Sequence, residues 1–329
     1  MQGLRIISGR GLALALGLLF AGPVLADDIR TVLLDPASAD GVVVLEDAVR
    51  GYEITDYLVP LAEGQTLRVT AEAGDPPAYM NLIAPGQKDV AFFIGASEGD
   101  SYEGRTDRTG NYKLRLYQMR SAARRGEVAP YTLRLETEGA PPELSEDHLI
   151  VAGLSGRLAL REAPEKDAPL ITRLGAGLTL DSRGCKDEGG QWWCEVALPQ
   201  DAGISGWASA DYLFPAIAPP DMKQDARVEG GPFHATGAVS CGRRRDALSA
   251  QCDFGVVRFG DGNGLVSLTL PDGKATGLLF EEGAPAGLVR LDASAPALPP
   301  LSVEQQGDLF RVTIGLYAFE IPEAVIRGG

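Results

Sequence analysis

The chain has 329 residues and a formal net charge of −15, from 45 acidic and 30 basic side chains. Nucleic-acid and anionic-membrane partners need Lys and Arg clustered over a whole face, so this charge argues against both. It favours a cationic partner, although acidity can equally serve only to keep an exported protein in solution.

The N-terminus predicts a cleaved secretory signal peptide over residues 1–26. Arg5 and Arg10 precede a short apolar run, and small residues lead to Ala26. The run is too short to span a bilayer, and no cysteine near Ala26 could accept a lipid. We therefore expect a soluble periplasmic protein that begins near Asp27 and has no membrane insertion. Loss of the two arginines takes its net charge from −15 to −17.

Two proline-rich breaks, at 139–143 and 215–221, divide the rest of the chain. Short alternating runs bounded by Gly, Asp, Asn and Pro recur throughout, and no pattern is long enough for an amphipathic helix. The predicted fold class is all-β. We predict a β-sandwich over 27–137, a linker over 138–147, a small barrel over 148–215, a linker over 216–230 and a β-rich domain over 231–329.

The first unit contains a predicted hairpin with a basic loop. Apolar side chains occupy even positions in 112–117 and odd positions in 131–135, which is typical of half-buried strands. Between these strands, Arg120, Arg124 and Arg125 stand out in an acidic chain. Such a loop either contacts a partner or braces its own domain.

The residues from about Val44 to Leu135 resemble the periplasmic inhibitors of invertebrate-type lysozyme. The resemblance rests on Tyr57, Gly64-Gln65, Pro85-Gly86, Gly95 to Gly104 and above all Tyr117-Gln118-Met119-Arg120-Ser121-Ala122-Ala123-Arg124-Arg125. It implies a loop that enters the lysozyme cleft, where a Ser-Gly motif and a Tyr present hydroxyls to the catalytic carboxyls. The corresponding positions here are Ser97, Glu98, Gly99, Asp100, Ser101 and Tyr102.

Glu98 departs from the family pattern, because it stands where the family has its serine. A carboxylate close to the enzyme's carboxyl pair in a desolvated cleft is costly, so inhibition could be lost. Ser97 and Ser101 flank it and could supply a hydroxyl instead. An ordinary polar turn is an equally good reading of this loop.

The arginine loop has two readings as well. Its arginines could support the contact loop, or they could pair with acids of their own domain, with Glu103, Asp107 and Glu127 as candidates. We expect the second role for at least one of them.

The second unit resembles a bacterial Src-homology-3 domain. The resemblance rests on Leu158-x-x-Arg161-x-x-Pro164, a Gly-bearing turn at 174–177, a Trp-containing strand and the closing Gly206-Trp207…Tyr212-Leu213. Ala159 departs from the usual Asn. The resemblance implies a five-stranded barrel that binds cell-wall peptides or glycans, or acts as a spacer. The candidate wall-binding residues are Trp192, Trp193, Trp207 and Tyr212.

Adjacent Trp192 and Trp193 point to opposite faces of a strand, so only one can be core. The other could form a surface contact or cover a disulfide. We expect the local disulfides Cys185 to Cys194 and Cys241 to Cys252, because the two close pairs fall in separate predicted domains of an exported protein. A metal site is not expected, since no Cys-x-x-Cys occurs and only two His are present. The third unit resembles the C-terminal region of other exported proteins of unknown role, which supplies no function.

We expect no enzyme activity and no cofactor. Zinc ligands, a free Cys with His and a Gly-x-Ser-x-Gly elbow are all missing, although a carboxylate pair remains possible in so acidic a chain. Two hypotheses remain. The first is a lysozyme inhibitor kept near the wall by its barrel. The alternative is a non-inhibitory envelope module that binds peptidoglycan fragments or a partner protein.

Overall fold

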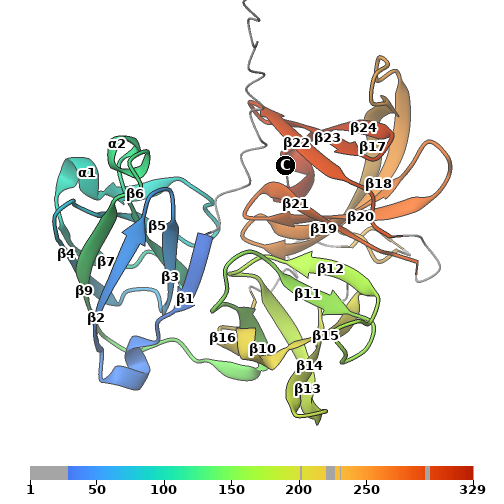
Figure 1. Ribbon diagram of the computed structural model, residues 1–329. Coiled ribbons are helices and arrows are strands. Elements are labelled where there is room, and N and C mark those ends of the chain that lie inside the picture. The colour runs from blue at the N-terminus through green and yellow to red at the C-terminus, as the bar shows by residue number, and fades with distance from the viewer. Residues whose placement is uncertain (1–28, 201, 220–226, 230, 293–296, 329) are drawn as a thin grey trace, which may run out of the picture.

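The structure, a computed structural model, describes residues 29–200, 202–219, 227–229, 231–292 and 297–328. The predicted signal peptide lies outside these residues. Three β-rich lobes meet at a common junction (Figure 1). Strands make up most of the described chain and the helices are one turn long, which confirms the predicted all-β fold class. None of the helices in the described ranges is long and apolar enough to cross a membrane.

The N-terminal domain consists of two sheets around one core. The first has the order β1 (Ile29–Leu33), β3 (Ile54–Leu61), β8 (Gly110–Tyr117), β5 (Tyr79–Ile83) and β6 (Ala91–Ile94). The second has the order β2 (Val42–Arg50), β9 (Val128–Glu138), β4 (Thr66–Ala73) and β7 (Ser101–Arg105). Short helices η1 (Pro36–Ala39), α1 (Gly95–Glu98) and α2 (Arg120–Ala123) join them. Leu114 and Leu116 of β8 meet Leu133 and Leu135 of β9 in the core, as their alternation predicts.

The middle domain is one curled sheet of seven strands, where the resemblance implies five. Its order is β12 (Leu170–Leu174), β11 (Leu158–Arg161), β15 (Ser205–Ser209), β14 (Gln191–Ala197), β13 (Thr179–Glu188), β10 (Ser145–Val151) and β16 (Leu213–Ala216), with η2 (Ala210–Tyr212) before the last strand. Strand β10 begins within the predicted linker. A disulfide joins Cys185 of β13 to Cys194 of β14, which confirms that predicted pair.

The C-terminal domain is an eight-stranded antiparallel sheet followed by a single helical turn. Its order is β21 (Ala284–Val289), β20 (Ala275–Glu281), β19 (Asn263–Thr269), β18 (Ala250–Gly260), β17 (Ala235–Arg243), β24 (Tyr317–Pro322), β23 (Leu309–Ile314) and β22 (Leu301–Gln306), and α3 (Ala324–Arg327) follows β24. The predicted Cys241 to Cys252 disulfide is confirmed and is buried between β17 and β18.

The middle and C-terminal domains share one hydrophobic core. Leu160 and Leu174 of the barrel belong to the same buried cluster as Phe259 and Leu279. The N-terminal domain docks through β1, whose Thr31 exchanges backbone hydrogen bonds of 2.9 and 3.0 Å with the barrel loop 153–154. The barrel therefore contacts both of the other domains. The end of the sandwich that carries α1 and α2 points away from the barrel (Figure 1).

Candidate functional site

The candidate contact loop, residues 97–102, follows an edge strand. Strand β6 pairs with β5 on one side only, and the chain then enters the single turn α1. Gly99 ends this turn with φ of 111°, a backbone conformation that favours glycine because a Cβ would be strained there. The backbone N–H of Ala71 donates to the carbonyl of Asp100 at 2.8 Å, so the loop is tied to β4 before β7 begins.

The polar side chains of the loop bind to the loop itself. The Glu98 carboxylate accepts a hydrogen bond of 2.7 Å from the Ile94 N–H. The Ser97 hydroxyl donates to the Ile94 carbonyl at 3.2 Å, and the Ser101 hydroxyl donates to Asp100 at 3.3 Å. All of these loop side chains are exposed. Glu98 therefore helps to close the helical turn, a role that the sequence did not suggest.

Tyr102 lies against its own domain rather than projecting from it. Its ring packs edge-on to Phe92 and Phe93, with centroid distances of 5.5 and 5.4 Å. The hydroxyl end lies over Gly104, where a Cβ would come within 2.2 Å of the Tyr102 oxygen. Burial raises the pKa of the phenol above its ordinary value. Tyr102 is therefore held as part of a half-buried aromatic cluster.

Two apolar side chains beside the loop were missed by the sequence reasoning. Phe92 and Ile94 are 44% and 42% exposed, whereas Phe93 between them belongs to the core. The strand sequence Ala91-Phe92-Phe93-Ile94 could have indicated this exposure. Its side chains alternate between two faces, and only one face packs in the core. The exposed pair places an apolar surface next to the polar loop.

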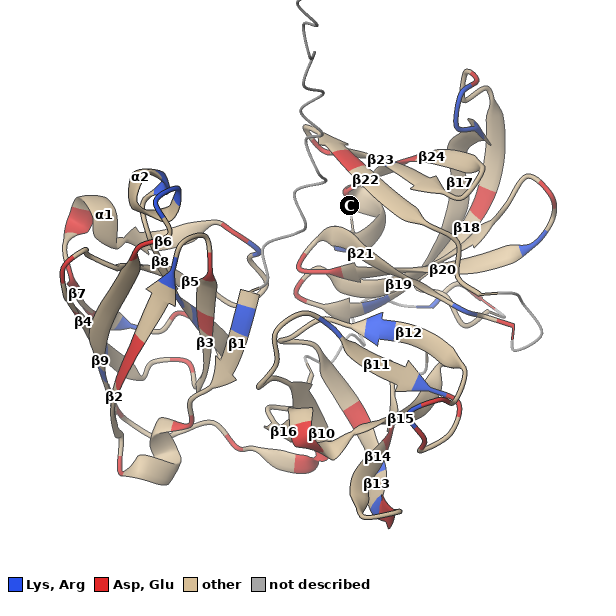
Figure 2. Ribbon diagram, viewed as in Figure 1, with Lys and Arg blue, Asp and Glu red and all other residues tan. Residues whose placement is uncertain are grey.

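The arginine loop lies at the same end of the domain as the contact loop. Strand β5 pairs with the last residue of β6 and with the last residue of β8, from which α2 follows. Figure 2 shows basic residues gathered at α2 and an acidic residue on α1. A hollow of about 660 Å³ lies beside α2, lined by Tyr52, Met119 and Arg120.

One of the three arginines pairs within its domain. Arg125 forms a 2.6 Å ion pair with Glu127, one of its predicted partners. Glu103 and Asp107 pair instead with Arg68 and Arg108. Arg120 and Arg124 are exposed, and across the described ranges their side chains show no ion pair or hydrogen bond. Their predicted support of the contact loop stays a prediction.

The loop around α2 is anchored by a neighbouring glutamine. The Gln118 amide donates hydrogen bonds of 3.0 Å to the carbonyls of Val49 and Glu127, so it joins β2 to the return strand of the hairpin. Sequence reasoning did not single out Gln118, although it lies within the stretch that carries the family resemblance.

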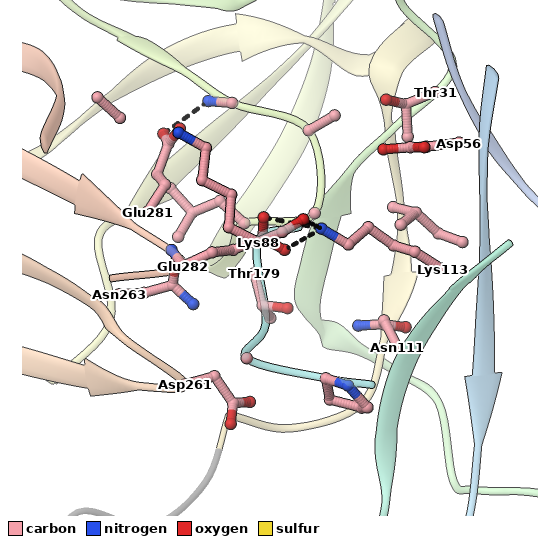
Figure 3. Close-up of a pocket in the computed structure, with 18 of the residues that line it drawn as sticks. Thr31, Asp56, Lys88, Asn111, Lys113, Thr179, Asp261, Asn263, Glu281 and Glu282 are labelled. Carbon is pink, nitrogen blue, oxygen red and sulfur yellow. Dashed lines mark hydrogen bonds and ion pairs between the residues drawn. The ribbon is translucent and has the colours of Figure 1, made fainter. Parts of the chain in front are cut away.

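A cavity of about 600 Å³ lies at the junction of the three domains (Figure 3). Its charges are largely paired with one another. Lys113 of the sandwich donates to both oxygens of Glu282 in the C-terminal domain at 2.8 Å. Arg115 binds Asp56 at 2.7 Å, and Arg157 of the barrel binds Glu281 at 2.7 Å. The Lys113 and Arg157 pairs join two domains each, whereas the Arg115 pair lies within the sandwich.

The barrel aromatics fall into different environments. Trp193 is buried and Trp192 is 56% exposed, which answers the question left open by their adjacency. Trp207 is half-buried beneath Lys186, whose ammonium lies 4.6 Å from the ring centroid. Trp193 and Tyr212 line one groove, of which Trp192 is not a part.

No group of three or more His, Cys, Asp and Glu side chains within the described part of the chain could hold a metal ion.

Comparisons with known proteins give only partial likenesses. No protein-family model and no curated protein matches the chain. Aeromonas hydrophila PliG, a periplasmic inhibitor of g-type lysozyme, is 31% identical over 34% of this chain and 100% of its own, with a TM-score of 0.32. Salmonella Typhimurium PliG is 19% identical over 33% of this chain and 98% of its own, with a TM-score of 0.27. The pre-peptidase C-terminal domain of a Bacillus anthracis collagenase is 12% identical over 35% of this chain and 98% of its own, with a TM-score of 0.24.

Two of these neighbours are named as inhibitors of g-type lysozyme, whereas the sequence motifs predicted the invertebrate type, and that lysozyme class stays a prediction. The likeness of the barrel to a Src-homology-3 domain stays a prediction.

Proposed function

We propose that the N-terminal domain is a lysozyme-inhibitor-like module whose contact loop enters the substrate cleft of a lysozyme. The observation that carries this proposal is an exposed surface at the end of the sandwich that carries α1. There the polar loop 97–101 stands beside the exposed side chains of Phe92 and Ile94. Apolar side chains next to polar groups suit a protein interface, because a few buried apolar contacts supply most of its binding energy.

The hydrogen bonds of the loop favour insertion into a cleft. A loop whose side chains already bind one another loses little conformational entropy when it is bound. One carboxylate oxygen of Glu98 accepts a hydrogen bond from the Ile94 N–H. This bond partly offsets the cost of bringing a negative charge near catalytic carboxyls. The net charge of −15 would also speed the encounter with a cationic enzyme.

The test is inhibition of wall lysis by the purified mature chain, with g-type and invertebrate-type lysozymes assayed side by side. We expect inhibition of at least one class at micromolar protein and a complex on a sizing column. Phe92→Ser and Ile94→Ser should each weaken inhibition by roughly tenfold, as for other interface anchors. Val303→Ser, an exposed apolar residue of the C-terminal domain, is the matched control. Full lysis by both enzymes and no complex would refute the proposal.

We further propose that the protein is exported, has no catalytic activity of its own, and contacts wall material through its barrel. Two disulfides support an oxidising compartment. The exposed ring of Trp192 supports a contact on the barrel. Binding to isolated peptidoglycan, compared between the native chain and Trp192→Ala, tests this second role. It also tests the alternative of a non-inhibitory module, for which wall binding would persist without lysozyme inhibition.

A further inference from the structure

The barrel carries a groove whose local charge is opposite to that of the protein. The groove has a volume of about 410 Å³ and lies at the loops that flank β11, β12 and β14. Four cationic residues line it, namely Arg157, Arg161, Lys166 and Arg173. Asp211 is the one acid among the described residues that line it. In a chain with a net charge of −15, such a gathering is unexpected from composition alone.

An aromatic side chain lies at the bottom of this groove. Trp193 is only 5% exposed, yet its neighbour Cys194 belongs to the barrel core. Because side chains alternate along a strand, Trp193 points away from that core, and it is one of the residues that line the groove. Tyr212, which also lines the groove, is 36% exposed. A ligand in the groove would therefore meet mainly the ring of Tyr212, together with the small exposed part of Trp193.

Only one of the four cations has a counter-charge among the described residues, and two have no polar partner there at all. Arg157 is neutralised by Glu281, and Arg161 donates to the Ala168 carbonyl at 2.8 Å. Lys166 and Arg173 are exposed, and within the described residues their side chains make no ion pair or hydrogen bond. Asp211 accepts a hydrogen bond of 3.2 Å from Ser209, another residue of the groove.

The acids next to Lys166 in the sequence, Glu165 and Asp167, do not line the groove. The described residues that line the groove therefore carry a net positive charge.

We propose that this groove binds a short peptide that carries free carboxylates. Arginine and lysine together suit carboxylates through charge-assisted hydrogen bonds, and the two rings suit the aliphatic part of a peptide. The volume falls within the range of about 300–1,000 Å³ typical of small-ligand sites, so it suits a peptide of a few residues. The polar side chains of Gln191 and Ser209 stand in the same groove and could bind peptide amides.

This inference concerns a groove that does not include Trp192, so it adds a second contact on the barrel and depends neither on the Trp192 contact nor on the lysozyme contact. The two proposals can fail separately, because the probe is a soluble peptide. If the acidic peptide binds and peptidoglycan does not, the proposed wall contact is refuted and the proposed peptide site in the groove is upheld.

The experiment is a calorimetric titration of the full mature chain with N-acetyl-alanyl-glutamate, followed in parallel by tryptophan fluorescence. We expect saturable binding with a dissociation constant in the millimolar range or lower. N-acetyl-alanyl-glutaminamide, which has no charge, should bind at least tenfold more weakly. The double variant Lys166→Gln/Arg173→Gln should lose at least tenfold in affinity and keep its near-ultraviolet circular dichroism, because both side chains are exposed.

Lys274→Gln is the matched control, since Lys274 is an exposed lysine of the C-terminal domain. Its affinity should equal that of the native chain. The proposal is overturned by equal binding of the charged and uncharged peptides, by an unchanged affinity of the double variant, or by no binding at all. Inorganic phosphate that binds as tightly as the acidic peptide would also overturn it, because the groove would then be an unselective anion site.

Discussion

At the scale of single residues, Glu98 combines two properties that can be separated by substitution. Its charge is unfavourable near catalytic carboxyls, while its oxygen closes the turn of α1 through the Ile94 N–H. A glutamine keeps the oxygen and removes the charge, whereas an alanine removes both.

We therefore expect Glu98→Gln to inhibit lysozyme at least as well as the native chain. Glu98→Ala should inhibit roughly fivefold less, the size of effect that one lost hydrogen bond gives. Hydrogen exchange at residues 95–100 should be faster in the alanine variant alone. If alanine and glutamine behave alike in both measurements, the hydrogen bond does not shape the loop.

Inside the sandwich, a buried polar chain makes stability depend on pH. The Tyr57 hydroxyl donates to Asp47 at 2.8 Å and meets the Tyr131 hydroxyl at 2.9 Å, while Arg30 also binds Asp47. Burial opposes ionisation of Asp47, but the hydrogen bonds from Arg30 and Tyr57 outweigh it, so its pKa lies below the ordinary 3.8. The carboxylate thus stabilises the fold fully above about pH 4, and this contribution is lost as the pH falls through the folded-state pKa.

Asp47→Asn should accordingly lower the free energy of unfolding by about 1–3 kcal/mol at pH 7, the range for hydrogen bonds to a charged group, and nearer the lower end because the Asp47 side chain is 29% exposed. The difference from the native chain should shrink as the pH falls below 3.8. Urea unfolding between pH 2.5 and 7 measures it. A difference that stays constant over this range would show that the ionisation of Asp47 contributes nothing.

At the scale of elements, strands were predictable and the short helices were not. Alternation located β8 and β9, because half of their side chains must enter the core. The single turns α1 and α2 have too few residues for a helical period, and α1 depends on a side-chain bond from Glu98 that composition does not reveal. The contact loop was predicted from its motif, and its contact stays a prediction. The burial of Tyr102 was missed because Phe92 and Phe93 come from another strand.

The barrel groove shows the same limit of prediction. Its tryptophan was a candidate from the sequence, but its cations come from the residue before β11, from β11 itself, from the following loop and from β12. Only the folding of the sheet brings them to one place, so no local pattern could predict their common role.

The two disulfides should differ in their reactivity toward a reductant. Cys185 is exposed in the hairpin of β13 and β14, whereas Cys241 and Cys252 are both buried in the C-terminal core. A reductant can therefore reach the first bridge in the native fold, but the second only after local opening. With limiting reductant and alkylation, mass spectrometry should find Cys185 and Cys194 labelled first. Equal labelling of all four would contradict this.

At the scale of the molecule, an ion pair between Lys113 and Glu282 holds the sandwich to the C-terminal domain. The Lys113 side chain is 7% exposed and donates to Glu282 and to the Lys88 carbonyl. The barrel and the C-terminal domain, by contrast, are joined by a shared apolar core. The N-terminal domain is thus the lobe whose attachment depends more on polar contacts, although Leu58 also meets Ile150 across its boundary with the barrel.

We expect Glu282→Gln to loosen this attachment more than Lys113→Met does. The first change leaves the Lys113 ammonium buried without its counter-charge, whereas the second removes the buried charge and keeps an apolar stem. Because the Glu282 side chain is 31% exposed, the loss should stay below the 3–5 kcal/mol typical of fully buried pairs, at about 1–2 kcal/mol.

Limited proteolysis of residues 139–144 and the radius of gyration in solution measure the loosening. Lys274→Gln, whose ion pair is exposed and lies within one domain, should leave both unchanged. If Lys113→Met loosens the lobe as much as Glu282→Gln, then the ion pair itself holds the domains, and the cost of an uncompensated charge does not decide the outcome.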